Sequence, residues 1–207
     1  MNRFDNRTKE KFKKDIKFGT MLEKYFFEKW MSVARSQNII YVTSYQNNGC
    51  DNNGEFISHG NTSGADYKIN GQLLQEGNKV VATIDSEPLE VKWVPSYGKL
   101  TLKEADLDAY VDERASILFI YNCGGVNLKK PKDYNLAKHI KLIEQNEDKI
   151  KWGIMWSFNV VRLFEHAYNN NLFKPIPYMG NKSGIVIQQK DFGKWFTSYN
   201  WRKNENS

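Results

Sequence analysis

Apolar residues recur at helical spacing through the first part of the chain. No proline interrupts residues 8–35, and Thr8 with the polar residues after it can begin a helix. The apolar positions that form one stripe on a helical projection are Phe12, Ile16, Leu22, Phe26, Trp30 and Val33. We therefore predict one long helix over residues 8–35, whose first turns are strongly basic.

Strand patterns begin after this helix. Residues 38–46 are rich in β-branched and aromatic side chains, which favours a strand. Residues 47–64 hold many glycines and asparagines, and a loop of this length inside a compact domain is often functional. Three more strands are predicted over residues 65–71, 79–85 and 88–95.

A helix and a buried strand are predicted next. Residues 101–114 have helical periodicity, with Thr101 as the N-cap. Residues 115–122 read ASILFIYN, a near-continuous apolar run. Such a run is typical of a central strand that is covered on both faces.

The last third of the chain is predicted to be mostly helical. Its elements are helices over residues 131–152 and 155–170 and a late strand over 183–191. The order of elements indicates an α/β fold with a mixed central β-sheet flanked by helices. The 207 residues fit a single domain, with a core over about 8–122 and a C-terminal extension over 123–207.

Charge adds a class of partner to this fold. The formal net charge is +6 and aromatic residues make up 14% of the chain, which favours an anionic partner such as DNA. The candidate DNA-binding residues are Lys13, Lys14, Lys129, Lys130, Lys132, Lys194 and Trp195. Two alternatives stay open: an ordinary basic protein, and a tail whose aromatic residues only dock onto the core.

Cysteine and histidine usage excludes other classes. The two cysteines and three histidines are scattered, which argues against a zinc site or a disulfide framework. Residues 1–15 lack the apolar core of a signal peptide, and no apolar run approaches the length of a membrane span. We expect a soluble, cytoplasmic protein without membrane contact. The small, Lys- and Asn-rich chain would suit a phage protein in the host cytoplasm.

Two charges interrupt an apolar strand at residues 88–95, PLEVKWVP. Glu90 and Lys92 are two residues apart and therefore point to the same face of the strand. Burying an unpaired charge is costly, so these two side chains need partners. A hydrolytic metal site would give them a role, with Asp66 as the second carboxylate from a neighbouring strand.

The segments GADYKI (64–69) and LEVKW (89–93) together resemble the PD-(D/E)XK nuclease superfamily. The resemblance covers about residues 8–122, and it differs at Ala65, where the family has a variable proline. It implies a restriction-endonuclease-like core and a Mg²⁺-dependent DNA endonuclease, in which Mn²⁺ can substitute. Asp66, Glu90 and the Val91 carbonyl would then bind the metal, and Lys92 would be catalytic.

The long helix offers a further ligand. Glu23 shares one stripe with Ile16, Phe27 and Trp30, and superfamily members often carry an acidic residue on this helix near the site. The alternative is a Glu at the boundary of the apolar face, paired with a lysine.

The motif itself has alternatives, because Asp/Glu-X-Lys recurs in the chain. Asp66-Tyr67-Lys68 can be the second motif, with Asp51 or Glu55 as its upstream acid. A solvated edge strand would also explain Glu90 and Lys92. At the level of function, the rival class is a non-catalytic nucleic-acid-binding or interaction protein with a degenerate nuclease fold. Paired nicks would favour a homodimer.

Overall fold

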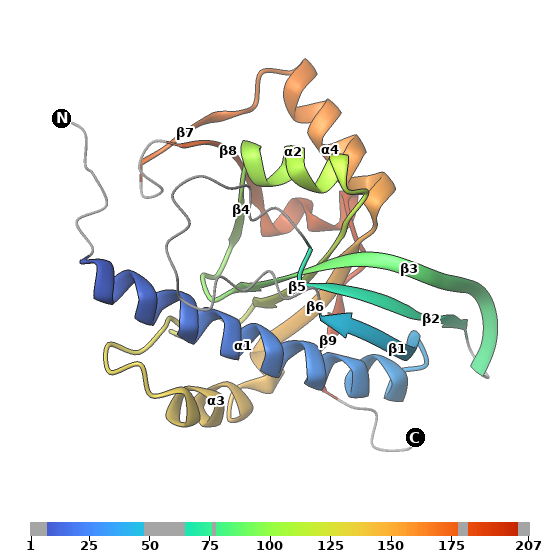
Figure 1. Cartoon of the computed structure of the whole chain (residues 1–207), viewed down its shortest axis with the longest axis horizontal. Helices are drawn as coiled ribbons and strands as arrows, with labels where there is room; N and C mark the ends of the chain where they lie inside the picture. Colours follow the sequence, from blue (N-terminus) through green and yellow to red (C-terminus); the bar gives the residue numbers. More distant parts are fainter. Residues whose placement is uncertain (1–7, 48–64, 76–77, 178–181, 203–207) are drawn as a thin grey trace.

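Six strands build the central sheet of the computed structural model, which describes residues 8–47, 65–75, 78–177 and 182–202 (Figure 1). The strand order is β1-β2-β3-β5-β6-β9, with β3 and β5 parallel and the other neighbours antiparallel. The strands are β1 (Ile40–Asn47), β2 (Tyr67–Gln75), β3 (Lys79–Val94), β5 (Ser116–Asn122), β6 (Ile150–Met155) and β9 (Tyr199–Asn200). The predicted α/β fold with a mixed central sheet is therefore confirmed.

One face of the sheet is covered by α1 (Lys9–Ser36), with α3 (Leu136–Glu144) beside it (Figure 1). The Thr8 side chain caps α1 by accepting the Lys11 N–H at 3.2 Å. The apolar stripe of α1 then packs on the sheet, where Phe26 and Trp30 are fully buried. None of the helices in the described part of the chain is both long and apolar enough to cross a membrane.

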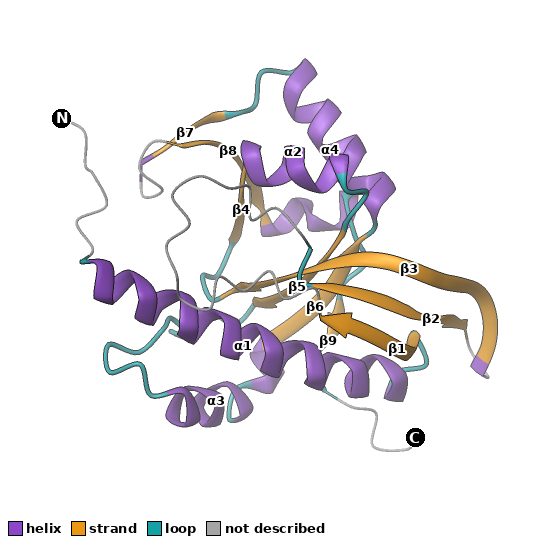
Figure 2. Cartoon of the chain, in the orientation of Figure 1, coloured by secondary structure: helices purple, strands orange, loops and turns teal. Residues whose placement is uncertain are grey.

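The other face is covered by α2 (Glu104–Asp112), α4 (Ser157–Asn169) and a small second sheet (Figure 2). The second sheet has the order β4-β8-β7, formed by β4 (Lys99–Lys103), β8 (Lys182–Gln188) and β7 (Lys174–Ile176). Every residue of β5 is buried between the two layers, as its apolar run predicted. Since β3 and β5 are parallel, the chain needs a crossover between them, and β4 and α2 form it.

The predicted strands over 79–85 and 88–95 are one continuous strand, β3. The polar residues between them mark a register shift in the pairing with β2, not a turn between two strands. Ser86 lies there with a φ of 49°, and its N–H donates to the Asn70 side chain at 2.9 Å. The Asn70 side chain on β2 therefore gives the Ser86 N–H a hydrogen-bond partner where the regular strand pairing is interrupted.

The predicted helix over 131–152 is wrong in its second half. Helix α3 ends at Glu144, and β6 follows within the central sheet. Alternate residues of β6, Trp152 among them, pack toward α1, but Lys151 and Gly153 hide the two-residue period. Two other boundaries move: Thr101 lies in β4, so Lys103 precedes α2, and the late strand ends at Gln188.

The C-terminal tail closes the fold. After the 3₁₀ helix Gln189–Lys194, the short strand β9 extends the central sheet beside β6. Trp201 is fully buried and its ring lies 5.6 Å from that of Phe26 on α1. The expectation that the tail aromatics dock onto the core therefore holds for Trp201.

Candidate active site

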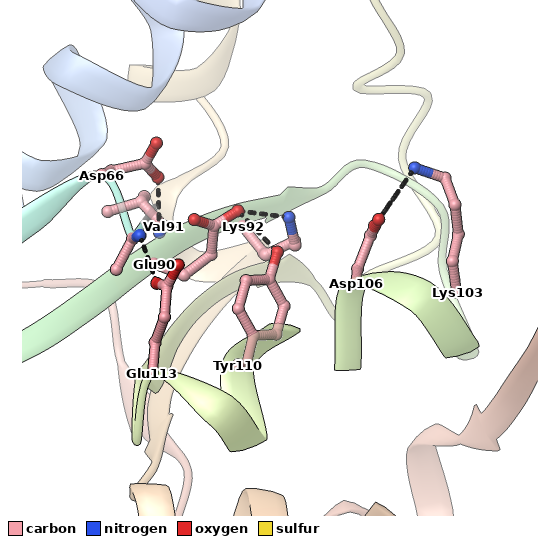
Figure 3. Close-up of polar contacts among 9 residues, drawn as sticks. Asp66, Glu90, Val91, Lys92, Lys103, Asp106, Tyr110 and Glu113 are labelled. Carbon is pink, nitrogen blue, oxygen red and sulfur yellow. Dashed lines mark hydrogen bonds and ion pairs between the residues drawn. The ribbon is translucent and has the colours of Figure 1, made fainter. Parts of the chain in front are cut away.

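Strand pairing brings Asp66 to the Glu90–Lys92 segment. Asp66 directly precedes β2, and Tyr67 pairs with Leu89 on β3. The Asp66 carboxylate accepts the backbone N–H of Val91 at 2.8 Å (Figure 3). The first acid predicted from the sequence thus lies beside the residue between Glu90 and Lys92.

Glu90 and Lys92 satisfy one another, together with a tyrosine from α2. The Lys92 ammonium donates to Glu90 Oε1 at 2.5 Å, and the Tyr110 hydroxyl donates to the same oxygen at 2.9 Å (Figure 3). The Glu90 side chain is only 12% exposed and that of Lys92 is 27% exposed. Because each charge has a partner, the cost of burying the pair is offset. The interpretation of 88–95 as an edge strand is wrong, since β3 lies between β2 and β5.

Each carboxylate keeps one oxygen without a hydrogen bond. Both bonds to Glu90 end on Oε1, and the bond to Asp66 ends on Oδ2. Within the described residues, Glu90 Oε2 and Asp66 Oδ1 accept nothing. Carboxylate oxygens of this kind are the ligands that hard divalent cations take.

The same residues do not form a ready-made ligand cluster. In the described part of the chain, no three His, Cys, Asp or Glu side chains are grouped so that they could hold a metal ion. Asp66 and Glu90 are therefore two acidic neighbours whose remaining oxygens can serve a cation, and a third ligand has to come from elsewhere, such as the backbone or Glu23.

The electrostatics of the site favour the protonated form of Asp66. The pKa of Asp66 is raised to about 8, by burial first and then by the neighbouring Glu90 and Glu23, against the opposing effects of the Val91 N–H and Lys92. Burial would lower the pKa of Lys92, but Tyr110 and Glu90 outweigh it and keep the pKa well above its usual value. Perturbed groups that share one place are typical of functional sites.

Glu23 on α1 interacts electrostatically with Glu90 and Lys92. It is half-buried, and among the described residues it makes no hydrogen bond or ion pair. Burial raises the pKa of Glu23 to about 7, with Lys92 lowering it and Glu90 raising it. The described residues therefore show no lysine paired with Glu23, which was the alternative explanation for this side chain. The role of Glu23 as a metal ligand stays a prediction.

Two supporting residues were not predicted as part of the site. Tyr110 and Glu113 are three residues apart, so they share one face at the end of α2. Glu113 accepts the backbone N–H of Ala65 at 3.0 Å, which fixes the chain next to Asp66 (Figure 3). The only sequence signal was the inward position of Tyr110, because nothing in the pattern of α2 relates Glu113 to residue 65.

The candidate DNA-binding residues are spread over the surface. Lys13 and Lys14 on α1, and Lys129 and Lys132 after β5, are exposed. The other three have partners: Lys130 bonds to Asp15, Lys194 to Asp191 at 2.7 Å, and the half-buried Trp195 ring lies 5.7 Å from that of His166.

The alternative motif keeps Asp66 and Lys68 within the described residues. Lys68 is exposed on β2, opposite Pro88, while Asp51 and Glu55 lie outside the described residues. No protein-family model, curated protein or solved structure matches this chain. The function must therefore be argued from the chemistry of Asp66, Glu90 and Lys92 themselves.

Proposed function

We propose that this protein is a Mg²⁺-dependent DNA endonuclease with a restriction-endonuclease-like core. The observation that carries the proposal is the bond from Val91 N–H to Asp66, which joins the upstream acid to Glu-Val-Lys on the next strand. Two acids and a lysine at one place are the groups that metal-assisted phosphodiester hydrolysis needs.

The arrangement of elements supports this proposal. Helix α1 is followed by the antiparallel strands β1, β2 and β3, then by α2 and the parallel strand β5. The resemblance implies this order: a helix before the site, and a helix and a strand after it. Glu23 on the first helix also raises the pKa of Asp66, which supports its assignment to the same site.

The donor set suits a hard cation. Asp66 and Glu90 would hold it through their remaining oxygens, with the Val91 carbonyl and Glu23 completing the ligands. A bound Mg²⁺ supplies Lewis acidity toward the scissile phosphate and lowers the pKa of a bound water. Lys92 orients the attacking water and offsets negative charge that develops on the phosphate. Tyr110 holds Glu90 by its hydroxyl hydrogen bond.

A cleavage assay tests the proposal directly. The purified protein is incubated with plasmid and linear DNA in Mg²⁺, Mn²⁺ or EDTA. We expect cleavage only with metal, with 5′-phosphate and 3′-hydroxyl ends, and loss of cleavage but not of DNA binding in Glu90→Gln and Lys92→Ala. Lys174→Ala, an exposed lysine on β7, is the matched control and should cut normally.

The rival class is a non-catalytic nucleic-acid-binding protein with a degenerate nuclease fold. One observation favours it: the described residues hold no group of three metal-ligating side chains. Such a protein would bind DNA equally well in EDTA. Failure to cut duplex, branched and single-stranded DNA with either metal would reject the endonuclease and leave the rival.

A further inference from the structure

A basic groove leads away from the candidate catalytic lysine. Its volume is about 460 Å³, and it runs from the end of β3 along β4 to the segment that follows β5. Its lining includes Lys92, Trp93, Pro95, Ser96, Lys99 and Lys129. Three of the lining residues are lysines and none is acidic. Lys92 is paired with Glu90, so Lys99 and Lys129 are the lysines by which the groove complements a chain of negative charges.

The backbone near Lys99 and Lys129 is anchored by contacts of neighbouring residues. Lys129 lies between Leu128, which is fully buried, and Lys130, which bonds to Asp15 on α1. Lys99 begins β4, which pairs with β8. Gln189 N–H also donates to the carbonyl of Gly98 at 2.8 Å, which fastens the turn before β4. The backbone that carries Lys99 and Lys129 is therefore anchored to the rest of the fold.

An exposed aromatic ring lies in the turn between β3 and β4, next in sequence to residues that line this groove. Tyr97 lies in sequence between Pro95–Ser96 and Lys99, which line the groove, and it is 60% exposed. Gly98 has a φ of 89°, a conformation that suits glycine and makes the turn tight. An exposed ring next to a lysine-lined groove is a combination that single-stranded nucleic acids use, with stacking for the base and lysines for the phosphates.

We infer that this groove binds a single-stranded DNA segment next to the phosphate at Lys92. Lys99 and Lys129 contact its phosphates, and an unpaired base stacks on Tyr97. A base inside a duplex is already stacked on its neighbours, so the substrate carries unpaired nucleotides on this side of the cut. The inference rests on the proposed endonuclease function and narrows its substrate from DNA in general to frayed, flapped or single-stranded DNA.

Binding of labelled oligonucleotides to the full chain tests the tyrosine. In EDTA, Tyr97→Ala should weaken binding of a single-stranded DNA 12-mer by about 5-fold or more, since stacking contributes ~1–3 kcal/mol per base. Binding of a blunt duplex of the same sequence should stay unchanged. The matched control is Tyr168→Ala on α4, a tyrosine that is 67% exposed and is not next in sequence to any residue that lines the groove, and it should bind both DNAs as the unchanged protein does.

The salt dependence of the same binding tests the lysines. The double variant Lys99→Ala/Lys129→Ala should reduce the slope of log K against log salt for single-stranded DNA by about 1.4, since each phosphate contact contributes ~0.7. The exposed Lys174→Ala serves as control. An unchanged slope, or equal loss for single strand and duplex in Tyr97→Ala, would overturn the inference.

The two proposals fail in different ways. If the protein cuts DNA with Mg²⁺ but Tyr97→Ala binds and cuts flapped DNA normally, the endonuclease stands and the groove assignment falls. If Tyr97→Ala loses single-strand binding but no DNA is cut with either metal, the groove assignment stands and the endonuclease falls. If no DNA binds at all, both are wrong.

Discussion

At the scale of single residues, the site is held by a few directed contacts. Val91 N–H positions Asp66, and Tyr110 together with Lys92 positions Glu90, all on one oxygen of each carboxylate. These contacts stiffen the site while leaving a second oxygen on each acid.

Removing the Tyr110 hydroxyl should destabilise the protein. Tyr110→Phe keeps the buried ring but removes the bond to Glu90, and a hydrogen bond to a charged group contributes about 1.5–3 kcal/mol. We expect Tm to fall by roughly 3–12 °C, because 1 kcal/mol corresponds to ~2–4 °C in a chain of this size. Thermal unfolding measures it. The exposed Tyr168→Phe should unfold at the unchanged temperature, and an equal loss in both variants would contradict the role of the bond.

The metal-free protein should lose stability as pH rises. The pKa of Asp66 is raised from 3.8 to about 8 by burial first and then by Glu90 and Glu23. The folded state therefore keeps a proton that the unfolded state has released, and stability falls between about pH 4 and pH 8. Asp66→Asn removes this effect. The Tm of the variant, relative to the Tm of the unchanged protein, should therefore be higher at pH 8 than at pH 5. Thermal unfolding in EDTA at both pH values decides, and a constant difference would contradict the raised pKa.

At the scale of elements, the largest difference between prediction and structure is β6, which the sequence pattern predicts as the end of a helix. The stretch IKWGIM carries one lysine and one glycine where alternation would show, so its apolar residues merged with the helical pattern before it. Gly153 has a packing reason, because a Cβ there would lie 2.5 Å from the Phe196 ring and from the Thr197 carbonyl. The glycine lets the C-terminal segment approach the strand.

A methyl group at this position should therefore be costly. Gly153→Ala must displace the Phe196 ring or the backbone of Thr197, and overpacking of this kind costs about 1–3 kcal/mol. We expect Tm to fall by roughly 2–12 °C. Gly193→Ala is the control within the same segment, since nothing lies within 4 Å of its added Cβ. Chemical denaturation of both variants should show a lower midpoint for Gly153→Ala alone.

At the scale of the whole molecule, the end of the first helix contacts the C-terminal tail. Gln37, at the end of α1, donates to the carbonyl of Asn200 at 2.7 Å and to that of Arg202 at 2.6 Å. Trp201 lies between them, buried against Phe26. The tail is thus part of the core that supports α1, the helix that carries Glu23.

Truncation of the tail tryptophan should unfold the protein at a lower temperature. Trp201→Ala leaves a large cavity beside Phe26, and such changes cost about 3–5 kcal/mol, or roughly 6–20 °C in Tm. Trp195→Ala, at a half-buried position in the same tail, should lose clearly less. Equal losses would show that the tail contributes through its surface and not through the core.

The sequence predicted what depends on local periodicity and on neighbouring strands. The long helix, β5 and the placement of Asp66 beside the Glu90–Lys92 segment followed from apolar spacing and from a hairpin-like return between the two strands. The contacts of Tyr110 and Glu113 could not be predicted, because they depend on where the crossover helix crosses the sheet. Packing in three dimensions sets that position, and no spacing in the sequence records it.

The position of β3 in the strand order also matters while the chain is being made. Until β5 has emerged, β3 is the last strand of a sheet made of β1, β2 and β3, with its backbone groups open to other chains. Charges that point inward on such a strand discourage wrong pairing between chains. We therefore expect Glu90 and Lys92 to reduce aggregation of the nascent chain in the interval before β5 is synthesised.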